Sequence, residues 1–154
     1  MLFRSLGDRF KPVGIFENVF KKGLLGKKSG KGYYIYGKER LVNPEVASLL
    51  TDTAPARFKA DEYIDRLILI MINEAARCLE EKIVEEADAI DVGMIFGTGF
   101  PPFRGGLLRY ADNRGIDNIV KSLEALAQNL NAERFKPCQY LLHLNDHNRT
   151  FYPV

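Results

Sequence analysis

Two histidines and two cysteines are the residues of this chain best suited to nucleophilic or metal chemistry. His143 and His147 are four positions apart, a spacing that places both imidazoles on one face of a helix. A metal site needs a third ligand, and Leu144 stands where the metalloprotease motif requires glutamate. No histidine precedes His143, so the earlier part of the chain cannot contain a histidine-centred dyad. We therefore expect no metal site and no catalytic dyad here.

The two cysteines indicate neither a nucleophile nor a disulfide framework. Cys78 lies in an apolar helical pattern and Cys138 is far from it in the sequence, so we expect Cys78 to be a small core residue. Two cysteines are too few for a disulfide framework, which favours a reducing compartment. The longest strongly apolar run, residues 67–72, is far shorter than the roughly 20 residues of a membrane span. These features predict a cytoplasmic chain without a membrane span.

Residues 97–106 form the segment most suggestive of a site. Four glycines and two prolines in these ten residues predict a rigid loop, with Phe100 and Phe103 as anchors. It begins like a dinucleotide motif, but Pro102 replaces the third glycine and prolines lack the N–H donors that a pyrophosphate needs. The loop either packs on the core or contacts a neighbouring domain or ligand. Its candidate contact residues are Gly97, Gly99, Pro101, Pro102, Arg104, Gly105 and Gly106, with Asp91 and Asp112 as partners for the Arg104 guanidinium.

A basic cluster occupies the first third of the chain. Gly26-Lys27-Lys28-Ser29 is similar to the end of a phosphate loop, but Lys21 stands where that motif requires its first glycine. We interpret the cluster as a solvated turn, and a CoA phosphate or an acidic partner is the alternative. The net charge of +2 is small and the charges are interpreted as evenly spread, so we expect no nucleic-acid partner. The cluster comprises Lys21, Lys22, Lys27, Lys28 and Lys31.

The elements that must position these residues are helices. The composition, 46% hydrophobic and 27% charged, is that of a globular protein. Apolar residues recur at helical spacing over residues 61–83 and predict a long central helix capped by Asp61. Only residues 32–36 suggest extended structure, so we predict an all-α fold. The other predicted helices are 13–22, stopped by Gly23; 45–50, capped by Asn43; 87–96, broken at Gly97; 107–113; 117–130; and 137–144.

An internal repeat bears on the domain organisation. Residues 9–12, Arg-Phe-Lys-Pro, recur as residues 134–137, each copy between a leucine-spaced segment and an apolar segment. We therefore predict that residues 1–55 are the tail of one helical unit plus a linker, and that residues 56–154 are a second, nearly whole unit. The chain is then expected to be a piece of a longer protein, and the alternative is a complete small protein.

A family resemblance rests on four stretches. Asp65-Arg66-Leu67, residues 73–81, Asp91-Val92-Gly93 and residues 97–106 together resemble the C-terminal domain of 3-hydroxyacyl-CoA dehydrogenases, and more closely its second copy in the α subunit of the bacterial fatty-acid oxidation complex. Residues 26–36 resemble the end of the first copy. The resemblance implies an all-α helical bundle of that domain type, preceded by a remnant of another copy.

The resemblance also implies a function. The parent enzyme carries an enoyl-CoA hydratase part, an NAD-binding Rossmann domain and two helical domains, and it oxidises 3-hydroxyacyl-CoA to 3-ketoacyl-CoA. The family's His–Glu dyad belongs to the Rossmann side, so we expect this piece to be an inactive docking domain with no cofactor of its own. Expected partners are the Rossmann and first helical domains of the same chain, acyl-CoA through the parent, a thiolase subunit, and a second copy of the piece.

Asp65 is the one position with an implied role near substrate. The family places an asparagine there, and a carboxylate cannot donate a hydrogen bond as an amide does. The aspartate fits a second copy of the domain that supports the first copy without taking part in the chemistry. The rival hypothesis is a free-standing all-α interaction or CoA-binding module without catalysis. An exposed apolar patch around Phe3, Phe10, Phe16 and Phe20 would favour the docking domain.

Overall fold

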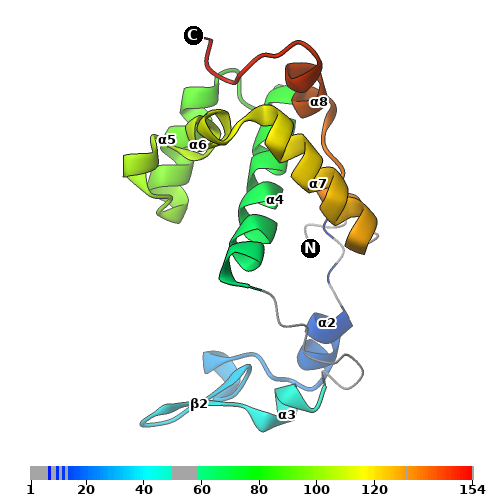
Figure 1. The fold of residues 1–154 in the computed structure, drawn as a ribbon. Helices are drawn as coiled ribbons and strands as arrows, with labels where there is room; N and C mark the ends of the chain where they lie inside the picture. The colour runs from blue at the N-terminus through cyan, green and yellow to red at the C-terminus, as the bar shows by residue number, and fades with distance from the viewer. Residues whose placement is uncertain are drawn as a thin grey trace. The chain divides into compact units, whose positions relative to one another are not determined.

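The structure is a computed structural model in which residues 7, 10, 12, 14–49, 59–130 and 132–153 are described. The chain divides into two compact units, Met1–Arg57 and Phe58–Val154. Figure 1 shows the second unit as a group of helices around α4 and the first as short helices with a β-hairpin.

Helix α4, Ala60–Glu80, is the central element of the second unit. It has an apolar face because Leu69, Ile72 and Ala76 recur at helical spacing and are each fully buried. The helix begins one residue before the expected cap: Lys59 occupies the N-cap, and its N–H donates to the Glu62 carboxylate at 3.1 Å. The expected capping role of Asp61 was therefore wrong.

The other helices of this unit follow the predicted order. The expected end of α5 at Gly97 was wrong, because this exposed glycine is tolerated within the helix and the left-handed turn falls at Gly99 (φ 74°). The long helix also ends earlier than the expected residue 83, since Lys82 has a positive φ of 55°. The bounds are α5, Ala87–Thr98; η3, Pro102–Arg104; α6, Leu107–Arg114; α7, Ile116–Leu130; η4, Glu133–Phe135; and α8, Gln139–Asp146.

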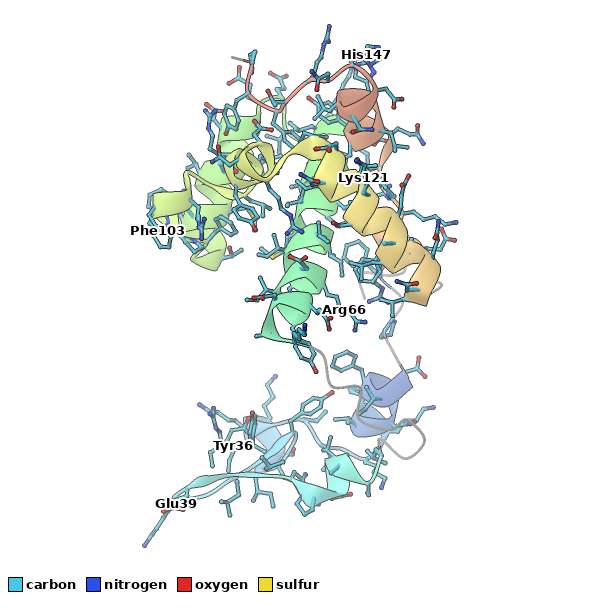
Figure 2. The ribbon with its side chains drawn as sticks, in the orientation of Figure 1. Tyr36, Glu39, Arg66, Phe103, Lys121 and His147 are labelled. Atoms are coloured by element: carbon cyan, nitrogen blue, oxygen red, sulfur yellow. The ribbon has the colours of Figure 1, made fainter. Side chains whose placement is uncertain are left out.

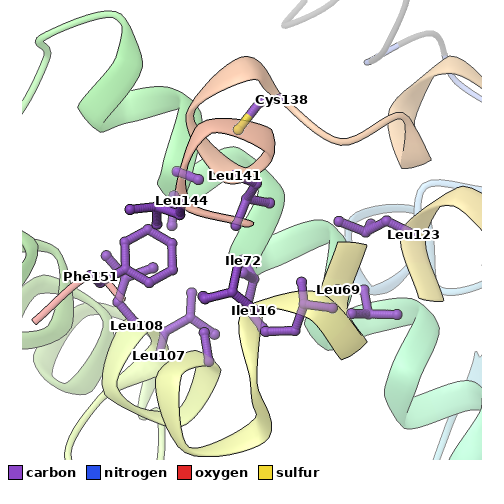
Figure 3. Packing of buried hydrophobic residues seen from close by; sticks show 14 of the residues in the cluster. Leu69, Ile72, Leu107, Leu108, Ile116, Leu123, Cys138, Leu141, Leu144 and Phe151 are labelled. Carbon is purple, nitrogen blue, oxygen red and sulfur yellow. The ribbon is translucent and has the colours of Figure 1, made fainter. Parts of the chain in front are cut away.

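One hydrophobic core holds these helices together. Figure 3 shows leucine and isoleucine side chains from α4, α6, α7 and α8 meeting beside Phe151 of the C-terminal segment. Burial of such side chains stabilises the fold by about 1.5–3 kcal/mol each. Fully buried aliphatic members of this core are Leu69, Ile72, Leu107, Leu108, Ile119, Leu123 and Leu141.

The first unit is small and contains the only strands in the described part of the chain. Among its described residues, Val19, Leu24 and Val46 form a buried hydrophobic cluster. Antiparallel strands β1, Tyr34–Tyr36, and β2, Arg40–Val42, pair Tyr34 with Val42, and β2 was not predicted. The all-α fold class is confirmed, with this hairpin as the exception. The helices are α2, Gly14–Lys21; η2, Lys27–Ser29; and α3, Pro44–Ala47, which Asn43 caps as expected by accepting the Glu45 N–H at 3.0 Å.

Candidate functional site

The glycine-rich loop ends on a buried carboxylate that caps α6. Asp91 comes from the middle of α5 and is 3% exposed. Its carboxylate accepts the backbone N–H of Leu108 at 2.6 Å and of Arg109 at 3.0 Å. The first N–H groups of a helix have no partner within the helix and carry its positive dipole end, so a carboxylate there satisfies both needs. Asp91 thereby ties α5 to α6.

This cap explains the paired glycines that precede α6. Gly106 has a φ of 117°, a conformation that side chains rarely adopt, and a Cβ at this position would run into the Asp91 carboxylate. Gly105 has a φ of 80°, and its Cβ would lie 2.9 Å from Cγ of Arg109. Both glycines therefore allow the backbone to pass close to the cap.

The two phenylalanines of the loop have different environments. Phe100 is buried and packs edge-on against Tyr110, with 6.3 Å between ring centroids. Phe103 is the middle residue of η3, is 84% exposed and lies on the outside of the unit, as Figure 2 shows. The expectation that both would act as anchors was therefore wrong for Phe103, because the described residues of this unit leave most of its ring exposed.

The C-terminal segment binds to the same region. Tyr152 donates its hydroxyl to Asp91 at 2.7 Å, and the Arg109 guanidinium lies 3.6 Å from the centre of the Tyr152 ring. The carboxylate of Asp112 accepts the N–H of Phe151 at 2.9 Å and of Tyr152 at 3.0 Å. Burial raises the pKa of Asp112 above its usual range, although these two N–H groups oppose the shift.

Arg104 is not held by the carboxylates that the sequence suggested. Asp91 and Asp112 are turned toward the backbone of α6 and of the C-terminal segment. The Arg104 guanidinium lies 5.7 Å from the centre of the Tyr110 ring and 5.8 Å from that of Phe103. This arrangement leaves a cation beside an exposed aromatic ring, which suits a contact surface better than a buried ion pair.

The loop does not fit a dinucleotide. A pyrophosphate would need the free N–H groups at the start of α6, and the Asp91 carboxylate already accepts them. The same carboxylate would repel a second anion at close range. The cradle that the glycines open is thus filled by the Asp91 carboxylate.

Asp65, the position with an implied role near substrate, is held in a salt bridge. Its two carboxylate oxygens accept from Arg114 at 2.7 and 3.0 Å in a bidentate pair. This hydrogen bond is the main cause of the raised pKa of Arg114. The pair joins the first turns of α4 to the last turn of α6, so the structure shows Asp65 as a connector between helices.

One buried polar residue was missed by the sequence analysis. Asn73 lies on the apolar face of α4, fully buried, and clamps the turn that precedes α8. Its amide donates to the carbonyls of Lys136 at 2.8 Å and Arg134 at 3.3 Å, and its Oδ1 accepts the Cys138 N–H at 2.9 Å. An asparagine in an otherwise apolar stripe was the available signal, since buried polar groups require partners.

His143 lies in the last turn of α8, which continues two residues beyond the expected end to Asp146, and His147 is the residue that caps it. The two rings are 4.2 Å apart, and His147 Nδ1 lies 2.9 Å from the His143 carbonyl. The described residues contain no group of three potential metal ligands. Cys138 is buried, which raises its pKa to about 11, so its thiol does not resemble an activated nucleophile. Cys78 is partly buried and packs against the hydrophobic core, in line with the expected core role.

The basic cluster forms a turn stabilised by its own residues. The Ser29 hydroxyl accepts the Leu25 N–H at 2.9 Å and donates to the Lys31 carbonyl at 2.8 Å. Lys31 pairs with Glu45 at 3.0 Å, and Lys27 and Lys28 are exposed. The one hydrogen of this hydroxyl is directed at the Lys31 carbonyl and not outward, so the geometry favours the solvated turn over a phosphate loop.

Comparison with known proteins identifies the family. The family described as "3-hydroxyacyl-CoA dehydrogenase, C-terminal domain" matches residues 63–151, which is more than half of the chain. The chain belongs to this family. The matched region begins at the start of α4 and ends at Phe151, so it contains the Asp91 cap, the Asn73 clamp and the glycine-rich loop of this dehydrogenase C-terminal domain.

Two curated relatives extend the similarity over the whole chain. The fatty acid oxidation complex subunit alpha of Idiomarina loihiensis is 44% identical over 99% of this chain, and that of Vibrio parahaemolyticus is 39% identical over 99%. In both cases the chain spans 22% of the relative's length. Within the described residues of this 3-hydroxyacyl-CoA dehydrogenase domain, every helix is too short or too polar to cross a membrane.

Proposed function

We propose that this chain is the structural and docking portion of a multifunctional enzyme of fatty-acid β-oxidation. The observation that carries the proposal is the identity of 39–44% over 99% of the chain to two fatty acid oxidation complex α subunits that are much longer. The parent enzyme oxidises 3-hydroxyacyl-CoA to 3-ketoacyl-CoA with NAD, and the present portion contributes no catalytic group. The polar side chains at its candidate site are engaged in holding helices together, which supports a positioning role.

The proposal divides the chain as the repeat suggests. Residues 1–55 are the tail of a preceding helical copy plus a linker, and residues 56–154 are the second copy. The division near residue 57 into two compact units supports this assignment. So does the separation of the two hydrophobic cores, which share no residue.

The loop is proposed as the contact surface for the other domains of the parent. Exposed Phe103 and the neighbouring Arg104 offer an apolar ring and a cation to the Rossmann and first helical domains. Gly97, Gly99, Pro101 and Pro102 shape this surface, and Gly105 and Gly106 fix it to the cap. Asp65 is a positioning residue, because both of its oxygens are held by Arg114.

Cofactor and substrate lie elsewhere in this proposal. NAD and acyl-CoA are held by the other domains of the parent, since the glycine-rich loop is already filled by Asp91. A thiolase subunit is a further partner. The isolated chain pairs with a second copy through apolar residues that the parent would cover, among which Phe16 and Phe20 are 54% and 71% exposed. Phe10 is half-buried, and Phe3 lies outside the described residues.

A chimera of the Idiomarina subunit tests the proposal. The matching 22% of that subunit is replaced by this chain, and NADH formation from a 3-hydroxyacyl-CoA is measured. We expect activity in the chimera, none in the subunit truncated before this region, and none in the 154-residue chain alone. NADH formation by the isolated chain, or full activity in the truncated subunit, would contradict the proposal.

The matched control uses a residue far from any exposed surface. Leu108→Asp places a charge in the core, where Leu108 is fully buried, and should abolish the gain that the chimera shows. Lys121→Ala removes an exposed side chain on α7 and should leave activity unchanged. Together the two substitutions show whether activity of the chimera requires the domain to be folded.

A further inference from the structure

Helix α2 of the first unit and helix α8 of the second share one backbone pattern at a constant distance along the chain. Both helices contain eight residues and begin two positions after a proline, Pro12 or Pro137. These prolines are 125 positions apart. The sequence repeat that contains them is short, so the agreement of backbone structure is an independent observation.

The hydrogen bonds before and after the helices agree at the same distance. Before them, Phe10 N–H donates to the Gly7 carbonyl at 3.1 Å, as Phe135 does to Ala132 at 3.1 Å. After α2, Leu24 N–H donates to the Val19 carbonyl at 3.1 Å. After α8, Arg149 does so to Leu144 at 2.8 Å.

The left-handed residues that end the two helices also correspond. Gly23 has a φ of 68° and Asn148 a φ of 50°. Glycine and asparagine are the residues that adopt this conformation most readily, so both sequences meet the same requirement. Where the residues of both copies are described, the backbone features named above therefore agree between the two helices and their flanking turns.

Burial is where the two copies differ. On α8, Leu141 is fully buried and Leu144 is 5% exposed. On α2, Val19, the counterpart of Leu144, is 6% exposed, but Phe16, the counterpart of Leu141, is 54% exposed. In the second unit, α8 packs against α4, and the Asn73 clamp of α4 holds the turn before α8. The first unit has no long helix among its described elements.

We infer that the Phe16 face of α2 is the seat of a long helix of the α4 type, supplied by a preceding copy of the domain. This inference rests on the proposed division of the chain. The occupying helix is amphipathic and carries a carboxamide side chain where α4 carries Asn73, because the clamp recognises backbone groups that any sequence in this turn possesses.

The surface around Phe16 fits an apolar occupant. Phe16 and Tyr33 pack edge-on with ring centroids 6.3 Å apart, and Phe20, one turn along α2, is 71% exposed. These side chains line a hollow of about 390 Å³ together with Val19 and Leu24. Aromatic and aliphatic side chains in a hollow accept the knobs of a helix better than they accept a polar ligand.

A transplant within the full-length chain tests whether the α2 segment fits an α4-type helix. Residues 9–24 replace residues 134–149, a substitution of equal length that puts Phe16 where Leu141 packs on α4. We expect a cooperative thermal transition with a lower Tm than the parent chain. Phe16→Asp within the transplant should abolish that transition. Phe16→Asp at its own position should leave the Tm of the second unit unchanged, because Phe16 is not part of that unit's core.

A second measurement decides the case in which the transplant does not fold. A copy of residues 58–133 is placed directly before residue 9, so that α2 follows an α4-type helix in its own chain. Amide hydrogen exchange in α2 should slow at least tenfold relative to the 154-residue chain, and Phe16→Asp should reverse this. Unchanged exchange overturns the inference.

These outcomes are independent of the enzyme assay. The transplant and exchange experiments report folding. If they fail while the chimera is active, the packing of an α4-type helix on α2 is contradicted and the docking function is not. If the transplant folds while the chimera is inactive, the docking function is contradicted and the packing on α2 is supported.

Discussion

At the scale of single residues, buried polar side chains hold the backbone in place. Asp91 satisfies the start of α6, and Asn73 satisfies the turn before α8. An unsatisfied buried backbone group costs about 1–3 kcal/mol, so each of these residues stabilises a whole turn. Both side chains contact the backbone directly, so the residues beside these contacts must be small enough to leave room for them.

Gly106 provides the sharpest residue-level prediction. Gly106→Ala forces a Cβ against the Asp91 carboxylate at a φ of 117°, so we expect the free energy of unfolding to fall by about 3 kcal/mol or more. Chemical denaturation followed by circular dichroism measures this change. The matched control is Gly93→Ala: Gly93 is exposed within α5 and its added Cβ meets no atom within 4 Å. For Gly93→Ala the free energy of unfolding should rise by about 0.5–1 kcal/mol. Equal effects of the two substitutions would refute the cap as the reason for Gly106.

At the scale of elements, the C-terminal segment is fixed to α6 by a carboxylate whose pKa is raised. Because burial raises the pKa of Asp112 in the folded chain, the folded state binds this proton more tightly than the unfolded chain does. Ionisation of Asp112 therefore opposes folding over the pH range between the unfolded value of 3.8 and the raised folded value.

The expected pH dependence follows from that sign. The difference in unfolding free energy between the parent chain and Asp112→Asn should fall as the pH rises through this range, and should be constant above it. Thermal denaturation of both proteins at a series of pH values measures the difference, and groups common to both cancel. A difference that rises with pH would show that the hydrogen bonds from Phe151 and Tyr152 outweigh burial.

At the scale of the whole chain, charge is distributed less evenly than the net value of +2 suggests. Residues 1–57 carry 11 Lys and Arg against 5 Asp and Glu, whereas residues 58–154 carry 11 against 15. The interpretation of an even spread was therefore wrong. The basic first unit and the acidic second unit each have their own surface character, in keeping with their separate hydrophobic cores.

Separate cores predict separate unfolding. Leu108→Ala should reduce the stability of the second unit by about 2.7–5 kcal/mol, because it empties a fully buried site. Amide exchange in α4 and α7 should accelerate accordingly, while exchange in residues 14–49 stays the same. Val46→Ala in the first unit should produce the reverse pattern. Acceleration throughout the chain after either substitution would show that the two units unfold together.

The sequence by itself determined which segments are helical and, to within one residue, where most of them begin. The apolar spacing around Leu69 and Ile72 required a long helix, and Asn43 and Gly23 supplied recognisable ends, because caps and periodicity are local properties. The family resemblance was also legible, since the glycine-rich loop and the start of α4 are contiguous motifs.

Tertiary structure alone decided what the polar residues do. Asp91 meets Leu108 and Tyr152, and Asn73 meets Cys138, across 17 to 65 positions of sequence, and no local pattern specifies such pairings. The same holds for burial: Phe100 and Phe103 belong to one motif, but packing covers only the first. Side-chain partners depend on which helices the shared core brings together, and that is a property of the folded chain rather than of any segment within it.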